Sequence, residues 1–457
     1  MMPNRPNICL QFLLALVWIL APMQADTFSW RTKENQVDAD INDWKLTKVL
    51  QAIALATGWK IYLEPGTETL VSIKFKSMAT AEAMPKLLGN LNYALQKKAG
   101  QPPRLFIYQT TIGSATELIE TPAGSTIVDD KGRLTRELVV RLKSGRRQSI
   151  EELAKRLNAK IIGRMDDQGI YRLEFETAAD AERANNDLES DPNVEDVEAN
   201  HQIQRPPNPE PLALASPMPL NLIPKPLGSG TPVVVGLIDS AVQPAGSGIK
   251  DFLLPQVSVA GESLTDDSTL SHGTAMASTI LRGISITTDS GSTSAKILPV
   301  DVYGTRESTS TYDVARGIAK AVQEGANIIN LSLGSNSNSS FLQKMISDLH
   351  SKGVLFVGAA GNEPTTAASY PAAYPEVIAV TAGDRHGNLA EYANRGSFVD
   401  IVAPGSNIVR FGDKSYMGSG TSFAAAYITG VATAMASDSK TPLSQLEAQL
   451  RSKLGKK

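Results

Sequence analysis

Apolar runs alternate with helical segments from residue 225 to the end of the chain, and this alternation limits the fold more than any other feature. The runs predicted to be strands are 233–238, 297–300, 328–331, 354–357 and 377–380. Continuous apolar strands are typical of a parallel sheet that helices cover on both faces. The helical segments are centred near Met276 or span 314–322, 341–349 and 424–435. We therefore predict a doubly wound α/β domain at 225–457, with functional groups at the carboxyl ends of its strands.

Four residues with reactive or hydrogen-bonding side chains lie where a predicted strand ends or a predicted helix begins. Asp239 ends the first strand in Val-Val-Gly-Leu-Ile-Asp-Ser, and His272 opens a helix in Ser-His-Gly-Thr. Asn362 follows another strand in Ala-Ala-Gly-Asn, and Ser422 precedes a helical run in Gly-Thr-Ser-Phe-Ala-Ala. A serine hydroxyl becomes a good nucleophile when an imidazole takes its proton, and a carboxylate orients that imidazole. These residues predict a hydrolase with an activated serine.

The motifs, in the order Asp, His, Ser, resemble those of the subtilisin-like (subtilase, S8 family) serine peptidases. The resemblance implies an endopeptidase in which Ser422 attacks the scissile carbonyl and forms an acyl-enzyme. His272 would act as base and then acid, and Asp239 would orient it. Asn362 and the backbone N–H of Ser422 would stabilise the oxyanion.

The same resemblance implies where a peptide substrate binds. Ser332, Leu333 and Gly334 would form an edge for an extended peptide backbone. The first specificity pocket would lie between that edge and Ala360-Gly361, with Ser369 near its floor. These segments contain no acidic residue, so we expect no strong preference for Arg or Lys at the cleaved position.

Some positions depart from the family pattern: Ala241, Ala275, Ser278, Phe423 and Ala426. They are packing and turn positions rather than proton-transfer groups, so they bear on rate and specificity. They also motivate an alternative, a catalytically weak or inactive subtilase-fold binding or scaffold protein of the cell envelope.

Residues 136–204 predict a ferredoxin-like α+β domain. The pattern is strand-helix-strand twice over, and Ser149 with Glu152 forms a capping box at the first helix. Its place before the α/β domain makes it resemble an inhibitor-I9-like propeptide, a folding chaperone and intramolecular inhibitor. The alternative is a permanent structural domain.

Two segments are predicted to be linkers. Residues 111–135 are rich in Gly, Thr and Ser, and residues 205–224 contain repeated prolines, which favour an extended and exposed chain. We expect self-processing of a zymogen between His201 and Leu220.

Residues 26–110 predict a small α+β module. Leu46, Val49, Leu50 and Ile53 follow the spacing of an amphipathic helix. The pattern resembles the short N-terminal domain of secretins and TonB-dependent receptors, and an unrelated α+β module fits it equally well. The resemblance implies a cell-envelope partner and a bacterium with an outer membrane.

Residues 1–25 predict a signal peptide, with Arg5 before an apolar run at 8–21 and Ala25 before the cut. A membrane anchor is the alternative. We therefore expect a secreted or periplasmic protein. Its one cysteine, Cys9, lies within that segment.

The net charge of −3 argues against nucleic acid as a partner, and the expected partners are a peptide or protein substrate and the propeptide. No cofactor is required by the predicted chemistry. Asp266 and Asp267 could bind calcium, although a solvated loop is the favoured interpretation. His201, His350 and His386 lie outside the motifs and are predicted to be surface or structural residues.

Overall fold

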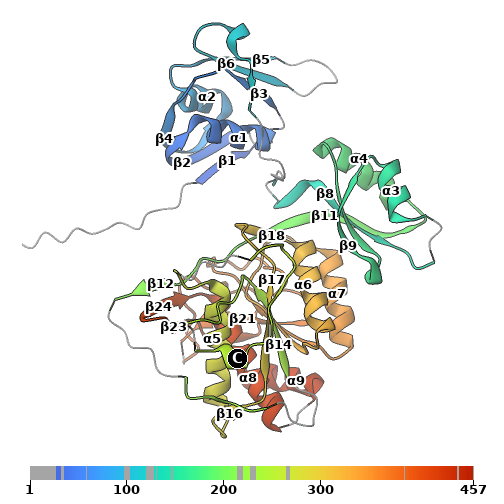
Figure 1. The fold of residues 1–457 in the computed structure, drawn as a ribbon, viewed down its shortest axis with the longest axis vertical. Coiled ribbons are helices and arrows are strands. Elements are labelled where there is room, and N and C mark those ends of the chain that lie inside the picture. Colours follow the sequence, from blue (N-terminus) through green and yellow to red (C-terminus); the bar gives the residue numbers. More distant parts are fainter. Residues whose placement is uncertain are drawn as a thin grey trace, which may run out of the picture. The chain divides into compact units, whose positions relative to one another are not determined.

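The computed structural model describes thirteen stretches of the chain. They are residues 27–31, 35–57, 59–96, 103–119, 128–129, 131–145, 148–213, 220–226, 233–246, 248–263, 268–384, 386–439 and 442–455. The chain divides into two compact units, residues 1–125 and 126–457. Figure 1 labels the elements of both units, and each unit is described by itself below. The predicted signal peptide lies outside the described residues.

The described residues of the first unit form two small sheets and two α-helices. The sheets have the strand orders β1-β2-β4 and β5-β6-β3-β7. Their elements are β1 (Thr27–Arg31), β2 (Gln36–Lys45), α1 (Leu46–Thr57), β3 (Lys60–Leu63), β4 (Leu70–Ala79), α2 (Thr80–Leu88), β5 (Asn92–Gln96), β6 (Arg104–Tyr108), η1 (Ile112–Ser114) and β7 (Glu117–Leu118). The predicted apolar face of α1 is confirmed, because Leu46, Val49, Leu50 and Ile53 are all buried.

The predicted linker at 111–135 is wrong at both ends. Strand β7 pairs with β3, and the amide of Ile119 donates to the carbonyl oxygen of Ile61 at 2.8 Å. Ile119 is buried in the core of the first unit. At the other end, β8 already begins at Arg133. β7 has only two residues, and polar residues occupy the start of β8, so composition did not reveal either position as a strand.

The second unit begins with the predicted ferredoxin-like arrangement. Its elements are β8 (Arg133–Leu142), α3 (Ile150–Arg156), β9 (Lys160–Met165), η2 (Asp166–Gln168), β10 (Ile170–Glu174), α4 (Ala178–Glu189) and β11 (Val194–Gln204). The strands are antiparallel in the order β11-β8-β10-β9. The capping box is confirmed: the Glu152 amide donates to Ser149 Oγ, and the Ser149 amide donates to Glu152 Oε2.

The proline-rich segment 205–224 is not simply a linker, which corrects the prediction. It contributes β12 (Glu210–Leu212), which pairs with β24 (Lys414–Ser419), and β13 (Ile223–Pro224), which pairs with β16 (Ser292–Thr293). Proline removes its own N–H, but its neighbours still pair along the edge of a sheet. Residues 214–219, within the expected processing region, lie outside the described residues.

The predicted doubly wound domain is confirmed by a seven-stranded sheet with the order β15-β17-β14-β19-β20-β21-β22, parallel throughout. Its strands are β14 (Val234–Asp239), β15 (Val257–Ser258), β17 (Lys296–Asp301), β19 (Ile328–Leu331), β20 (Leu355–Ala359), β21 (Val377–Gly383) and β22 (Ile401–Pro404). The helices are α5 (His272–Thr287), α6 (Thr311–Gln323), α7 (Ser340–Ser351), α8 (Thr421–Ser439) and α9 (Leu443–Leu454). The remaining elements are η3 (Lys250–Phe252), β18 (Ser308–Ser310) and β23 (Ser406–Phe411).

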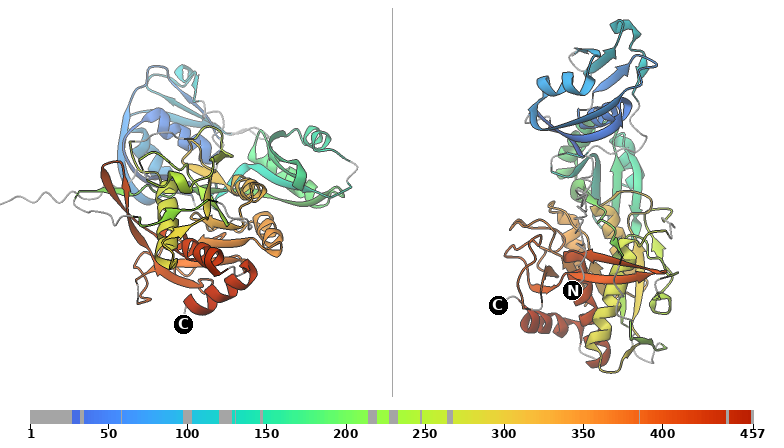
Figure 2. Two further views of the ribbon diagram at one scale, coloured as in Figure 1. Left: turned by 60° about the horizontal axis from the view of Figure 1, so that its bottom comes forward. Right: turned by 90° about the vertical axis from the view of Figure 1, so that its left-hand side faces the viewer.

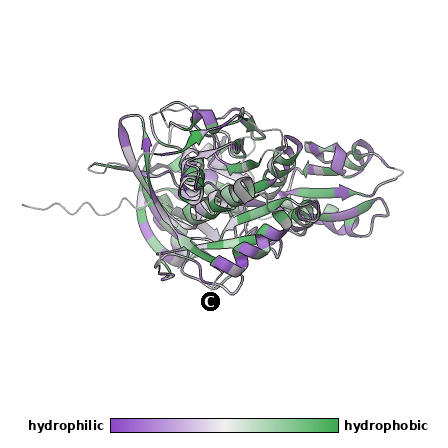
Figure 3. Ribbon diagram, turned by 90° about the horizontal axis from the view of Figure 1, so that it is seen from below, coloured by the Kyte–Doolittle hydropathy of each residue, from purple (hydrophilic) through white to green (hydrophobic). Residues whose placement is uncertain are grey.

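Helices cover both faces of this sheet, so its strands are buried. Helices α5, α8 and α9 pack on one face, and α6 and α7 pack on the other (Figures 1 and 2). The strands are coloured as hydrophobic along most of their length in Figure 3. The hydrophobic core between the sheet and helices α6 and α7 also includes Val139, Met165, Ile170 and Ile203 from the ferredoxin-like domain. Among the described residues, no helix is both long and apolar enough to span a membrane.

Candidate active site

The predicted catalytic residues lie at one edge of the parallel sheet. Asp239 is the last residue of β14, and Asn362 follows the end of β20. His272 is the first residue of α5, and Ser422 is the second residue of α8. Because the strands are parallel, their carboxyl ends share one edge, where the following helices also begin.

Asp239 and His272 form a buried pair. His272 Nδ1 lies 2.8 Å from Asp239 Oδ1 and 2.9 Å from Oδ2. Their side chains are 3% and 1% exposed, so little water competes for the contact. A carboxylate on Nδ1 leaves Nε2 as the ring nitrogen available to accept a proton. This geometry suits a histidine acting as a general base.

Hydrogen bonds around the pair hold it in place. The Ser240 amide donates to Asp239 Oδ1 at 2.7 Å, and the Gly273 amide donates to Ser240 Oγ at 3.0 Å. A Cβ on Gly273 would lie 2.1 Å from the Ser240 carbonyl oxygen, which explains the glycine. Ser271 caps α5 by accepting from the Thr274 amide, and its hydroxyl donates to the carbonyl oxygen of Ala241 at 2.7 Å.

Ser422 is held at the start of α8 by a reciprocal pair of bonds with Ser332. Ser422 Oγ donates to the Ser332 carbonyl oxygen, and Ser332 Oγ donates to the Ser422 carbonyl oxygen, both at 3.1 Å. Within the described part of the chain, no hydrogen bond joins Ser422 Oγ to His272. Ser422 Oγ would therefore have to turn about the Cα–Cβ bond to reach the imidazole.

Phe423, one of the departures from the family pattern, packs beside the imidazole. Its ring lies edge-on to His272, with centroids 6.4 Å apart and planes at 78°. A Cβ on Gly418 would lie 2.0 Å from the Phe423 ring, so that glycine makes room for the aromatic side chain. Phe423 thereby forms an apolar wall beside the histidine. Ala241, Ala275 and Ala426 are buried packing residues.

The side chain of Asn362 is oriented by Thr421. Asn362 Oδ1 accepts from the Thr421 amide at 2.8 Å and from Thr421 Oγ1 at 3.0 Å. Thr421 Oγ1 in turn accepts from the Gly361 amide at 3.0 Å. With the oxygen held in this way, the exposed Asn362 side chain has its Nδ2 group free to donate. Sequence reasoning missed Thr421 because it adjoins the motif without reacting.

The residues predicted for the first specificity pocket divide into two groups. A Cβ on Gly334 would lie 3.1 Å from Ser369 Oγ, and one on Gly361 would lie 3.5 Å from the same atom. These two glycines and Ser369 therefore lie together. Leu333 and Ala360, by contrast, are buried in the core, so only their backbone groups could meet a peptide.

The chain itself crosses this edge of the sheet after leaving β11. Strand β11 pairs with β18, matching Gln202 with Ser310 and Gln204 with Ser308. The Arg205 amide then donates to the carbonyl oxygen of Glu307 at 2.9 Å. Further along, Asn208 Oδ1 accepts from the backbone amide of His272 at 3.0 Å. Strand β12 then pairs with β24. Residues 202–212 therefore run from β18, past the start of α5 at His272, to β24.

Two side chains of β11 cap helices of the α/β domain. Asn200 Oδ1 accepts from Thr311 Oγ1 at 3.0 Å and from the Tyr312 amide at 3.1 Å, at the start of α6. Glu198 Oε2 accepts from Ser340 Oγ at 2.6 Å and from the Phe341 amide at 3.2 Å, at the start of α7. A carboxylate is favoured at the positive end of a helix.

A buried ionic cluster joins the same two domains. Arg172 donates through Nε and Nη2 to Glu137 at 2.7 and 2.9 Å, and through Nη1 to Asp313 at 3.2 Å. The side chains of Glu137 and Asp313 are 2% and 3% exposed. Burial opposes the charge on Arg172, but these carboxylates outweigh it and raise the pKa of Arg172. Asn200 Nδ2 also donates to Glu137 Oε2 at 2.8 Å.

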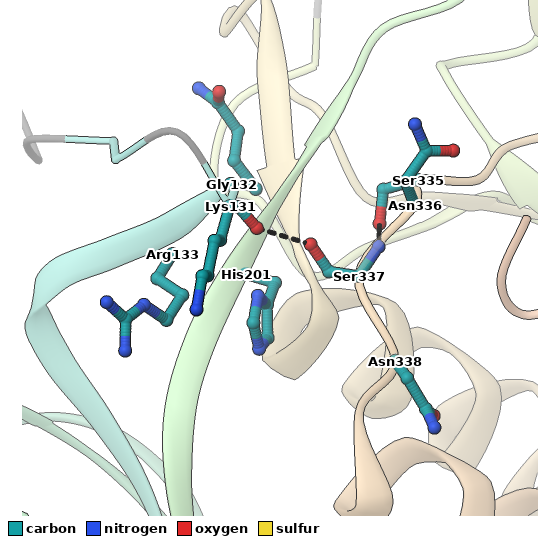
Figure 4. A pocket seen from close by; sticks show the side chains of 9 residues that line it. Lys131, Gly132, Arg133, His201, Ser335, Asn336, Ser337 and Asn338 are labelled. Atoms are coloured by element: carbon teal, nitrogen blue, oxygen red, sulfur yellow. Dashed lines mark hydrogen bonds between the residues drawn. The ribbon is translucent and has the colours of Figure 1, made fainter. Parts of the chain in front are cut away.

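A cavity of about 490 Å³ lies at the same contact. Figure 4 shows Lys131 and His201 from the ferredoxin-like side facing the loop that contains Ser337 and Asn338. Ser337 Oγ donates to the Lys131 carbonyl oxygen at 2.7 Å. Burial lowers the pKa of His201, and its Nδ1 has no partner among the described residues. His350, by contrast, pairs with Glu447 at 2.7 Å.

Among the residues that the structure describes, no three His, Cys, Asp or Glu side chains gather where they could hold a metal ion. Asp266 and Asp267, considered above for calcium, lie outside the described residues.

Comparison with known families matches two parts of the chain. Residues 230–453 match the family model described as the subtilase family. Residues 123–200 match the one described as the fervidolysin N-terminal prodomain.

Individual relatives cover part of the chain. It is 39% identical over 181 residues to M-protease of Shouchella clausii, which covers 38% of this chain and 46% of that protein. It is 38% identical over 181 residues to subtilisin Savinase of Lederbergia lenta, covering 38% of this chain and 65% of that protein. The match thus spans less than two thirds of the length of each relative.

A solved structure shares the fold. It is a crystal structure of the epidermin leader peptide processing serine protease of Staphylococcus aureus, which matches with a TM-score of 0.53 at 16% identity. The match covers 69% of this chain and 92% of that one.

Proposed function

We propose that this protein, whose residues 230–453 belong to the subtilase family, is a serine endopeptidase made as a zymogen. The observation that carries the proposal is the buried contact of His272 Nδ1 with both oxygens of Asp239, at the sheet edge where Ser422 begins α8.

In the proposed reaction, Ser422 Oγ attacks the scissile carbonyl carbon as His272 Nε2 takes the hydroxyl proton. The tetrahedral oxyanion accepts hydrogen bonds from Asn362 Nδ2 and the backbone N–H of Ser422. The imidazolium, stabilised by Asp239, then gives its proton to the departing amine and leaves an acyl-enzyme. Water, activated by the same imidazole, releases the acid. Loss of one oxyanion donor of this kind costs about 2.7–4 kcal/mol of transition-state stabilisation.

The proposed substrate is an extended peptide. Its backbone would pair with the edge at Ser332, Leu333 and Gly334, and with β18 on the other side. The side chain before the cut bond would lie beside Gly334, Gly361 and Ser369, next to Ala360. A small, uncharged floor of this kind favours neutral side chains.

The ferredoxin-like domain would act as intramolecular inhibitor. Support comes from β11, which occupies the β18 edge that a substrate needs, and from Asn208, which accepts a hydrogen bond from the backbone amide of His272 before β12 pairs with β24. Release would require a cut in the chain followed by dissociation of the caps at α6 and α7. Export by the predicted signal peptide and an envelope partner for residues 26–110 complete the proposal and rest on sequence pattern alone.

The second candidate is an inactive scaffold on the same fold. The observation that favours it is the hydrogen bond of Ser422 Oγ to the Ser332 carbonyl oxygen, which leaves the nucleophile turned from the base. A rotation of one side-chain torsion reverses this, so we favour the enzyme.

Hydrolysis of denatured casein by the purified full-length protein tests the proposal. We expect release of peptides by the wild type and a loss of at least about 10⁴-fold in kcat/KM for Ser422→Ala and His272→Ala. Asp239→Asn should lose a similar factor because the imidazole tautomer is no longer fixed. Equal, near-zero rates for all four proteins, with no cut between His201 and Leu220 in the wild type, would support the scaffold instead.

A further inference from the structure

We propose that a subsite formed by Tyr303, Gly304 and the Glu307 carbonyl oxygen selects peptides with arginine at the position that Arg205 occupies. The inference rests on the proposed peptidase function and adds a substrate class to it. It concerns a position ahead of the cleaved residue, and so is separate from the neutral pocket beside Ser369.

Arg205 is bound on three sides in the structure. Its backbone amide donates to the Glu307 carbonyl oxygen at 2.9 Å. Its Nη2 donates to the Gly304 carbonyl oxygen at 2.6 Å, and its guanidinium carbon lies 5.5 Å from the centroid of the Tyr303 ring. Tyr303 is fully buried, and its hydroxyl donates to the Gln204 carbonyl oxygen at 3.1 Å. The Tyr303 ring and the Gly304 carbonyl oxygen therefore form a fixed binding site for the guanidinium group, which we call the seat.

The place of Arg205 along the chain puts the seat next to the reacting bond. Gln202, Ile203 and Gln204 pair with β18, as an extended peptide would. Asn208 already contacts the backbone amide of His272. Only Pro206 and Pro207 separate Arg205 from that contact. A substrate following the same path would place its residue at this position shortly before the bond that Ser422 attacks.

Buried negative charge beneath the seat favours a cation. Asp301 Oδ1 accepts from the amides of Tyr303 and Gly304 at 3.0 and 2.9 Å. Asp301 Oδ2 is buried without a partner in the described part of the chain, and Asp301 pairs in register with Asp239. A carboxylate whose charge is not paired makes the seat more attractive to a cation and hostile to an acidic side chain.

The geometry distinguishes arginine from lysine. A planar guanidinium can lie over the Tyr303 ring and still donate in its own plane to the Gly304 carbonyl oxygen. An ammonium group is a point charge that stays more strongly hydrated. The Nε of Arg205 is buried without a partner among the described residues, so the preference should be moderate.

The proposal is tested with synthetic peptides and the full-length protein after it has processed itself. Each peptide copies residues 201–213, with the two prolines replaced by cleavable neutral residues. Variants would carry Arg, Lys, citrulline, Ala or Glu at the position of Arg205, with the cut mapped by mass spectrometry. We expect kcat/KM for Arg to exceed that for Ala and citrulline by about tenfold or more, with Lys between and Glu lowest. Equal rates for Arg, Ala and citrulline would overturn the proposal.

Enzyme variants locate the preference. Tyr303→Phe keeps the ring, so the Arg-to-Ala ratio should persist, whereas Tyr303→Leu should reduce that ratio towards one. If the ratio of kcat/KM for the Arg and Ala peptides is unchanged in Tyr303→Leu, the preference does not depend on this ring, and the proposed subsite is contradicted. Ratios are compared because either change can alter the absolute rate.

A measurement independent of catalysis separates this proposal from the peptidase proposal. In the Ser422→Ala protein, hydrogen exchange of the backbone amides of Ile203, Gln204 and residue 205 should speed up about tenfold in Arg205→Ala and much less in Arg205→Lys. Unchanged exchange in Arg205→Ala would contradict the proposed arginine subsite even if the wild type cleaves peptides. Faster exchange together with no peptide cleavage by the wild type would contradict the peptidase proposal but still support the binding of Arg205 at Tyr303 and Gly304.

Discussion

Two small α+β domains of similar size lie in this chain, and their cores are built differently. The core of the first unit is made of residues from its own segment, between Phe28 and Ile119. The ferredoxin-like domain buries only one face of its sheet under its own helices. From the other face, Val139, Met165 and Ile170 join the core that contains α6 and α7. One module is thus self-sufficient, whereas the other completes its core with the domain that it would inhibit.

The polar contacts repeat this difference. Arg172, Asn200 and Glu198 all reach partners on α6 or α7 or in the residues that begin them. In the first unit, the ion pair of Lys74 with Asp40 lies on the surface. Changes that disrupt buried contacts between domains should therefore matter far more than changes to a surface pair. The predictions below use the Ser422→Ala background, so that self-digestion does not interfere.

The largest effect is expected from Arg172→Met. Glu137 would lose its cation while remaining 2% exposed, and breaking a buried pair costs about 3–5 kcal/mol. Denaturant unfolding should show this loss in the transition of residues 126–457, while the transition of the first unit stays in place. An unchanged free energy of unfolding for the second unit would show that the cluster is not what couples the two domains.

The double change Asn200→Ala with Glu198→Ala should have the next largest effect. Each side chain caps a helix of the α/β domain, and a lost cap costs about 0.5–2 kcal/mol. The matched control is Thr177→Ala, because Thr177 caps α4 within the ferredoxin-like domain itself. Added thermolysin, which cuts on the amino side of large apolar residues, should cut before Ile203 faster in the double variant. Equal rates in both variants would contradict a role for these caps in holding the domain.

A smaller, pH-dependent effect is expected at His201. Burial lowers its pKa from the ordinary 6.5 in the folded protein, with Glu198 and Asp129 opposing and Arg133 reinforcing that shift. Below pH 6.5 the unfolded chain therefore binds more protons at His201 than the folded protein does. The contribution of His201 to the free energy of unfolding is complete above that pH and falls as the pH drops. The difference between wild type and His201→Gln in unfolding midpoint should narrow from pH 8 to pH 5. A constant difference would contradict the shift.

The smallest effect is expected from Lys74→Ala in the first unit. The side chains of Lys74 and Asp40 are 71% and 37% exposed, and exposed pairs of this kind contribute about 0–1 kcal/mol. The unfolding midpoint of the first unit should hardly move, and the second unit should not respond. A loss of unfolding free energy comparable to that of Arg172→Met would contradict the difference between the surface pair and the buried cluster.

Local patterns predicted much of this fold, because periodicity and caps act over a few residues. The parallel strands, the helices that follow them, the face of α1 and the Ser149 capping box could all be read in this way. The motifs also placed Asp239 and His272 at positions that the fold brings together.

Contacts between distant residues could not be read from the sequence. Prolines at 205–224 predicted a linker, but partners for β12 and β13 lie far along the chain, at β24 and β16. The Ser422 hydroxyl was expected to face the histidine, and its rotamer depends on the Ser332 carbonyl oxygen. His201, expected to be an ordinary surface or structural residue, is half-buried and lines a cavity with a loop more than a hundred residues away. Pairing and packing of this kind depend on the complete fold.

The measurement that tests the central claim most directly is reaction of the wild-type protein with a fluorophosphonate, followed by mapping of the adduct by mass spectrometry. The account predicts an adduct on Ser422, formed faster when Asn200→Ala and Glu198→Ala weaken the ferredoxin-like domain's hold, and absent from Ser422→Ala. An unlabelled Ser422 in both the wild type and the double variant would contradict it.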